Sequence, residues 1–155
     1  MKHQSASDTH GMYRGLAIEM AVDFVIMYFV MYTMIASIDH LHLNVNNAYM
    51  TLMMVVPMTV VMLFGMRSMF PSRRLNLTIA VGATLVFAAS FVAMRKQGAV
   101  GDEQFLRSMI PHHSGAILMC EQASLSDLEI VNLCEQTIRS QQKEIAQMEA
   151  ILARE

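Results

Sequence analysis

The sequence predicts an all-α membrane protein, in which a three-helix transmembrane bundle with up-down-up topology precedes a water-soluble helical hairpin. Hydrophobic residues make up 54% of the 155 residues and charged residues only 15%, whereas soluble domains carry about 25% charged residues. Only six charged residues lie between positions 16 and 94, and the charge density rises after position 97. The chain therefore divides into a polar N-terminal tail (1–15), a transmembrane domain (16–96) and a hairpin domain (97–155).

Three apolar stretches have about the 20 residues that a helix needs to cross the hydrocarbon core of a bilayer. They are residues 16–38, 48–66 and 75–94. The first is too long for the apolar region of a signal peptide and no small-residue cleavage site follows it, so it is read as an uncleaved helix. The connections at 39–47 and 67–74 are short, which favours antiparallel neighbours.

Orientation is predicted from the distribution of basic residues, which favour the cytoplasmic side. Three Arg lie in the 67–74 connection, on the same side as Lys2 and Arg14 of the tail. Arg95 and Lys96, which follow the third span, favour the opposite orientation. The balance predicts a cell (inner) membrane protein with a cytoplasmic N-terminus and a periplasmic or extracellular hairpin.

Methionine is unusually frequent, with 17 residues. In the second span it recurs every four residues, which places one stripe along a helix: Met50, Met54, Met58, Met62 and Met66. In the first span Glu19 and Asp23 begin a similar stripe, and ionisable residues within a span usually face a polar path or the bundle interior. Thioethers suit Cu(I), so the stripes are a candidate transmembrane path. The alternative is Met that packs or faces lipid.

The hairpin domain is predicted to start at Asp102 as an N-cap and to turn near residues 124–126. Seam positions in its second helix alternate three and four residues apart, as in a heptad repeat, and all but the polar Gln141 are apolar: Val131, Cys134, Ile138, Gln141, Ile145, Met148 and Leu152. A register centred near Leu125 places Gln141 opposite Met109. Because a short hairpin offers little core, pairing with a second copy into a four-helix bundle is expected.

The first hairpin helix carries the residues with the clearest chemistry. Met109, His112, His113 and Met119 present two imidazoles and two thioethers on one side of a helix. This set suits Cu(I), or Cu(II) through the imidazoles. Pro111, inside the same helix, removes a backbone hydrogen bond and is read as a device that aims the imidazoles.

Cys120 and Cys134 are the only cysteines. In the register centred near Leu125 they lie about a turn out of step, which argues against an intrachain disulfide. They are buried small residues, additional soft metal ligands, or a pair formed between subunits.

The stretch DEQFLRSMIPHHSGAILMCEQA (102–123), together with QQKEIAQM (141–148), resembles the family known as domain of unknown function 305. The resemblance implies a ferritin-like helical bundle, and some members are implicated in periplasmic copper binding and resistance. It implies Met109, His112, His113 and Met119 as ligands, with Met148 as a further candidate. This chain has one hairpin rather than a tandem pair, which again favours a homo-oligomer.

The function expected from these features is copper capture, buffering or resistance by a membrane-anchored protein. His40 and His42 fall on the same side of the membrane as the hairpin and are candidate additional ligands. The alternatives are a copper-ion transporter or channel that uses the Met stripe, and a structural oligomerisation module without metal. An enzyme is not expected, because no Glu-x-x-His motif of a ferritin-like oxidase is present. The net charge of −2 gives no indication of nucleic-acid binding.

Overall fold

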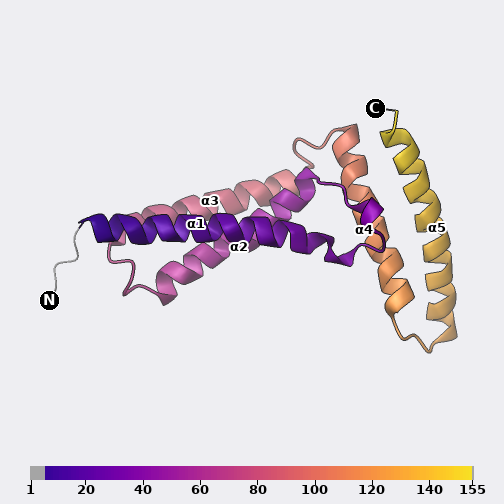
Figure 1. The fold of residues 1–155 in the computed structure, drawn as a ribbon, viewed down its shortest axis with the longest axis horizontal. Coiled ribbons are helices and arrows are strands. Elements are labelled where there is room, and N and C mark those ends of the chain that lie inside the picture. Colours follow the sequence, from indigo (N-terminus) through magenta and orange to yellow (C-terminus); the bar gives the residue numbers. More distant parts are fainter. Residues whose placement is uncertain (1–5, 155) are drawn as a thin grey trace. The chain divides into compact units, whose positions relative to one another are not determined.

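The computed structural model describes residues 6–154, which form α-helices and short 3₁₀ helices and no β-strand (Figure 1). In chain order they are α1 (Ala6–Val30), η1 (Met31–Met34), η2 (Ile38–His40), α2 (Val45–Gly65), α3 (Arg73–Arg95), α4 (Asp102–Gln122) and α5 (Leu128–Leu152). The all-α prediction is confirmed. The chain forms two compact units, one made of Met1–Phe29 and Ala48–Gly98, the other of Val30–Asn47 and Ala99–Glu155.

Three helical segments of the chain are long and apolar enough to cross a membrane, namely His10–Met34, Val45–Gly65 and Arg73–Arg95. No more than 17% of the most apolar stretch of each is buried within the protein. The first helix starts earlier than expected, so residues 6–15 of the predicted polar tail are helical. It also ends earlier than position 38, because the backbone becomes extended at Ile35, after η1.

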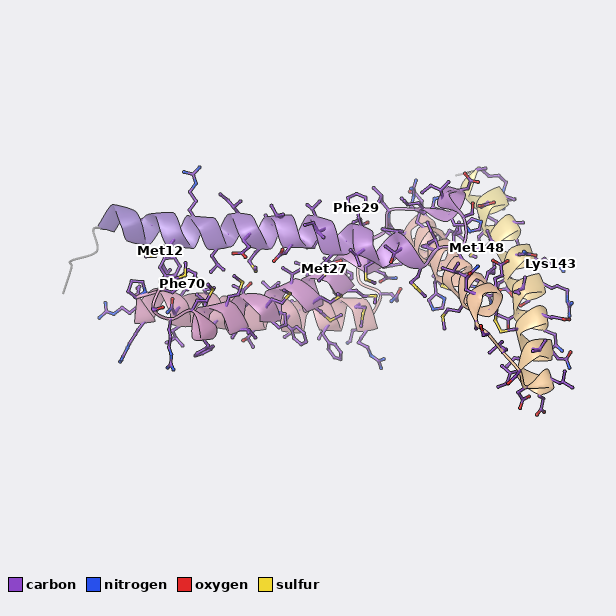
Figure 2. All side chains as sticks on the ribbon, turned by 60° about the horizontal axis from the view of Figure 1, so that its bottom comes forward. Met12, Met27, Phe29, Phe70, Lys143 and Met148 are labelled. Carbon is purple, nitrogen blue, oxygen red and sulfur yellow. A yellow bond between two sulfur atoms is a disulfide. The ribbon has the colours of Figure 1, made fainter. Side chains whose placement is uncertain are left out.

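In the first unit, α1 packs antiparallel to α2, and the start of α3 joins the same core. The side chains of Leu16, Leu63 and Phe70 are buried there, and Met12 packs against them; Figure 2 shows Met12 and Phe70 facing each other. Three hydrogen bonds also hold the helices of this unit together. Tyr13 donates to Asn76 Oδ1 (2.6 Å), Asn76 Nδ2 donates to the carbonyl of Phe70 (2.9 Å), and Thr59 donates to the sulfur of Met20 (2.8 Å).

In the second unit, α4 and α5 form the predicted hairpin around three buried isoleucines, Ile110, Ile117 and Ile145. Ile138, Met148 and Leu152 pack against them, which confirms most of the seam predicted for the second helix. The turn spans residues 123–127, and Asp127 caps α5 by accepting hydrogen bonds from two backbone amides. The predicted N-cap of α4 is wrong by one residue, because Gly101 holds that position and Asp102 lies in the first turn.

The predicted register of the hairpin is also wrong, and with it the argument against an intrachain disulfide. Cys120 and Cys134 are joined by a disulfide with their Cα atoms 5.3 Å apart, and His113 pairs with Glu144. Both pairs are centred beyond Leu125, near residues 127–129. The physical reason is that the helices adopt the register that buries the isoleucines. In this register Gln141 is only half-buried.

The segment between α1 and α2, residues 31–44, is a docked part of the second unit, together with the first three residues of α2, and is called here the connecting segment. It meets α4 at two small residues. Ser114, which is fully buried, accepts a hydrogen bond from the amide of Ala36 (2.7 Å) and shares a second one with His40 Nδ1 (2.7 Å). At Gly115 a Cβ atom would come within 3.3 Å of the carbonyl oxygen of Met34. Small side chains at these positions therefore allow the close approach of the two backbones.

Pro111 also serves this docking. Because proline has no N–H, the carbonyl of Arg107 four residues earlier has no intrahelical donor. Asn44 Nδ2 of the connecting segment donates to that carbonyl (3.4 Å). The Oδ1 atom of Asn44 accepts from the amide of Asn47 (2.8 Å), which caps the start of α2. Asn44 thus lies at the end of the connecting segment and caps α2. It also donates a hydrogen bond to the Arg107 carbonyl that Pro111 leaves without an intrahelical donor.

We predict that Ser114→Ala loosens the connecting segment, because it leaves the amide of Ala36 and the ring of His40 without their partner. Loss of a buried partner costs about 1–3 kcal/mol. Hydrogen exchange of amides 31–47 in the detergent-solubilised full-length protein measures the loss. Ser140→Ala, which removes only a local bond to Thr137 on exposed α5, is the matched control. Equal exchange in both variants would contradict the docking role.

Candidate metal-binding site

Because α4 is one continuous helix, the four candidate ligands lie at different heights and on different faces of it. His112 is exposed, Met109 is half-buried and Met119 is 61% exposed. Met109 and His112 are three residues apart, which makes them neighbours on the helix surface. Met119 lies seven residues beyond His112, about 10 Å along the axis. Met109 and His112 can therefore share one small ion, whereas Met119 cannot reach the same ion without leaving the helix.

His113 has a different environment, because both of its ring nitrogens are already bound. Its side chain is buried, Nδ1 donates to the carbonyl of Met109 (2.8 Å), and Nε2 shares a hydrogen bond with Glu144 Oε2 (2.8 Å). Each ring nitrogen therefore has a hydrogen-bond partner. The ring links α4 to α5 and lies edge-on to His112, with centroids 5.9 Å apart. It can bind a metal only if the contact with Glu144 opens.

The additional candidates in the hairpin are placed in its core or in a covalent bond. Met148 packs against the buried isoleucines, and Figure 2 shows it on the side of α5 that faces α4, with Lys143 directed away. Cys120 and Cys134 form the disulfide and neither is a free thiol. Their expected role as soft ligands is wrong for this oxidised protein, because the thiolate is the form that binds metal.

The histidines of the connecting segment serve its docking on α4. His40 is held by Ser114. His42 Nε2 is buried and has no hydrogen-bond partner among the described residues. Burial lowers the pKa of His42, with a further lowering by nearby Arg107, while Glu149 opposes the shift. Within residues 6–154 no group of three or more His, Cys, Asp or Glu side chains is arranged to hold a metal ion.

The lowered pKa of His42 predicts how stability changes with pH. The unfolded chain, with the ordinary pKa of 6.5, takes up the proton before the folded protein does. This residue therefore makes docking less stable as pH falls below 6.5, and the effect levels off below the folded pKa. We expect the protection of the amides in the connecting segment, expressed relative to the intrinsic exchange rate at each pH, to fall between pH 7.5 and pH 5. The fall should be smaller in His42→Asn, and an equal fall in both proteins would contradict the prediction.

The candidate transmembrane path lies mostly at the surface of the first unit. Met62 packs into the core, whereas the other four members of the stripe in α2 are 38–43% exposed: Met50, Met54, Met58 and Met66. In α1, Glu19 is exposed and Asp23 half-buried. A single chain therefore does not enclose this stripe.

Two residues that matter here were not identified from the sequence. Glu144 precedes a seam position of α5, and its acidic side chain beside the seam is the signal that could have paired it with a histidine of α4. Asn44 precedes α2, and its N-cap preference could have marked the end of the connecting segment.

The family whose profile matches this chain is described as "Domain of unknown function (DUF305)", and the match covers residues 83–152. The chain is also 36% identical over 118 residues to an uncharacterized protein of Acanthamoeba polyphaga mimivirus, which covers 75% of this chain and 76% of the relative. That similarity exceeds the matched segment and so extends further into the apolar helices. No solved structure matches the chain. The chain belongs to the DUF305 family.

Proposed function

We propose that this protein is anchored in a membrane by α1, α2 and α3 and captures or buffers Cu(I) on α4. The observation that carries the proposal is the pairing of an exposed imidazole, His112, with a thioether one turn earlier, Met109. Thioether sulfur is a soft donor that selects Cu(I), and imidazole also suits copper. In this proposal copper is the cargo of the protein, and Met119 is a second, separate point of contact.

His113 is proposed as a reserve ligand whose availability depends on Glu144. The contact between Nε2 and Glu144 Oε2 (2.8 Å) occupies the nitrogen that a metal would need. Recruiting this ring to a copper ion requires that the contact opens, so that the lone pair of Nε2 can face the metal. Copper captured by Met109 and His112 would therefore bind more weakly than a fully enclosed site, which suits exchange and buffering.

The proposed location is the outer side of a cell (inner) membrane for the hairpin, with the N-terminus in the cytoplasm. The disulfide between Cys120 and Cys134 supports this orientation, because structural disulfides persist in oxidising compartments such as the periplasm. The three Arg of the α2–α3 connection support it from the other side of the bilayer. The exposed apolar surface of α1, α2 and α3 supports a lipid surrounding.

A homo-oligomer also remains part of the proposal, through the free side of the hairpin. The connecting segment covers part of α4 from within the same chain. Leu128 and Leu133 at the start of α5 are 78% and 61% exposed. A second copy would therefore associate through the start of α5 rather than through the face of α4 that the connecting segment covers.

A competition titration of the full-length protein in detergent tests the proposed function. Cu(I) is distributed between the protein and a chromogenic Cu(I) chelator, and Zn(II) is titrated in parallel. We expect one Cu(I) bound per chain, with an affinity that allows exchange with the chelator, and a weaker response to Zn(II), since the pair contains a thioether. Failure of the protein to compete for Cu(I) would overturn the proposal. Extraction of membranes with alkaline carbonate tests the anchor separately, and we expect the protein to stay in the membrane fraction.

A further inference from the structure

A pocket of about 680 Å³ opens at the connection between α2 and α3. Its polar side is formed by Arg67, Ser68, Arg73 and Asn76. Neither Arg67 nor Arg73 forms an ion pair with any described residue, so two unneutralised guanidinium groups line one pocket. α3 begins at Arg73, so the positive end of its dipole adds to the same field. The polar side of the pocket therefore favours an anion.

The rest of the pocket is apolar and lies along the same two helices. Leu63 and Phe64 of α2 and Leu77 and Ala80 of α3 form this part of the lining. One turn further along both helices a second cavity of about 320 Å³ continues between them, lined by residues that include Val60 and Ala83. The α2–α3 pair thus presents basic groups at its end and a hydrocarbon-lined groove next to them.

We propose that this pocket binds an anionic phospholipid, with its phosphate at Arg67 and Arg73 and an acyl chain along the α2–α3 groove. Arginine matches phosphate through paired N–H donors, and basic pockets between transmembrane helices on the cytoplasmic side bind anionic headgroups. A free phosphate ion would use the guanidinium groups but leave the apolar lining empty. The proposal rests on membrane insertion, which is part of the proposed function, and is independent of copper binding.

Two of the side chains that line the pocket are held by contacts within the first unit. Phe70 is buried in its core. Asn76 is held by Tyr13 and by the carbonyl of Phe70. Arg74 neighbours Arg73 in sequence but does not line the pocket. This difference separates a specific site from a general attraction between basic residues and acidic lipid.

Native mass spectrometry of the full-length protein, released from detergent micelles with added lipid, tests the proposal. We expect one dioleoylphosphatidylglycerol retained per chain at concentrations at which dioleoylphosphatidylcholine is lost. Arg67→Gln/Arg73→Gln should weaken retention by roughly tenfold or more, since each basic group contributes about fivefold near an acidic lipid. Arg74→Gln should change it less than about twofold. The charge-conserving Arg67→Lys/Arg73→Lys should recover part of the retention, because lysine keeps the charge but lacks the paired donors of arginine, and this recovery separates loss of charge from misfolding.

Three results would overturn the proposal. One is equal retention of the two lipids by the wild-type protein. Another is an equal loss in Arg74→Gln and in Arg67→Gln/Arg73→Gln, which would indicate general electrostatic attraction. The third is displacement of the lipid by millimolar inorganic phosphate, which would identify the free anion as the ligand. A protein that is not embedded at all would be recognised by its release in alkaline carbonate, and that result would count against the anchor itself.

Discussion

His112→Ala should lower the affinity of the full-length protein for Cu(I) by at least about tenfold, since even partners outside the ligand shell change metal affinity by about 10–100-fold. Met109→Leu should have a similar effect, because leucine preserves the volume of methionine but lacks its sulfur. The reason is that these two residues share one turn of α4 and the imidazole of His112 is exposed. Competition with a chromogenic Cu(I) chelator measures both affinities.

Two controls make this test specific. Met119→Leu removes a thioether about 10 Å farther along α4 and should leave the first Cu(I) unaffected. His10→Ala removes an exposed imidazole from α1, outside the hairpin unit, and should also have no effect. If Met119→Leu weakens binding as much as Met109→Leu, the ion is held by a rearranged α4 and the assignment of the pair is wrong.

Replacing both cysteines with serine should destabilise the hairpin by about 3 kcal/mol, the value expected for cross-linking a chain of about 15 residues. The disulfide joins the last turn of α4 to the second turn of α5, across a separation of 14 residues. Without it, the isoleucine core and the pair of His113 with Glu144 remain as the contacts between the helices. Hydrogen exchange of the α5 amides in the detergent-solubilised protein should accelerate by about a hundredfold.

The single variant Cys120→Ser is the control for the double variant, because removing either sulfur breaks the same bond. It should match both the double variant and the reduced wild-type protein in exchange rate. The Cu(I) affinity of the double variant should stay within about threefold of the wild type, because the disulfide sulfurs are not ligands and the double variant leaves no free thiol. Unchanged exchange in the double variant would show that the core alone determines the stability of the hairpin.

The helices and their apolar faces could be predicted from the sequence because both depend on local patterns. Continuous apolar runs gave the three long helices, and the spacing of Ile138, Ile145, Met148 and Leu152 gave the packed face of α5. The turn between α4 and α5 followed from its small and polar residues. These features depend on near neighbours in the chain, which is the range over which sequence periodicity is informative.

The register of the hairpin and the docking of the connecting segment could not be predicted in the same way. The register depends on which side chains bury the most apolar surface across two helices. Moving the centre of the hairpin by two residues shifts the pairing of the helices by four, which separates an unpaired Cys120 from a disulfide. Docking depends on Ser114, Gly115 and Asn44, which are small or polar and give no periodic signal. Pro111 was expected to aim the imidazoles, and its visible consequence is the carbonyl of Arg107 that Asn44 satisfies.

The sequence predicted that the four candidate ligands share one helix, but not that their surroundings differ. The residues Met109, His112, His113 and Met119 lie on one helix as expected. Their roles differ because His113 faces α5 and Glu144, whereas His112 faces solvent. Such a difference between adjacent histidines depends on the position of the second helix, which the sequence did not give.

X-ray absorption at the copper edge, measured on the full-length protein loaded with one Cu(I) per chain, tests the central claim most directly. The proposal predicts that the copper is surrounded by both sulfur and imidazole nitrogen. It also predicts that sulfur scattering is lost in Met109→Leu and imidazole scattering is reduced in His112→Ala. A copper environment with oxygen and nitrogen alone in the wild-type protein, or one unchanged by both substitutions, would contradict the assignment of this pair as the copper site.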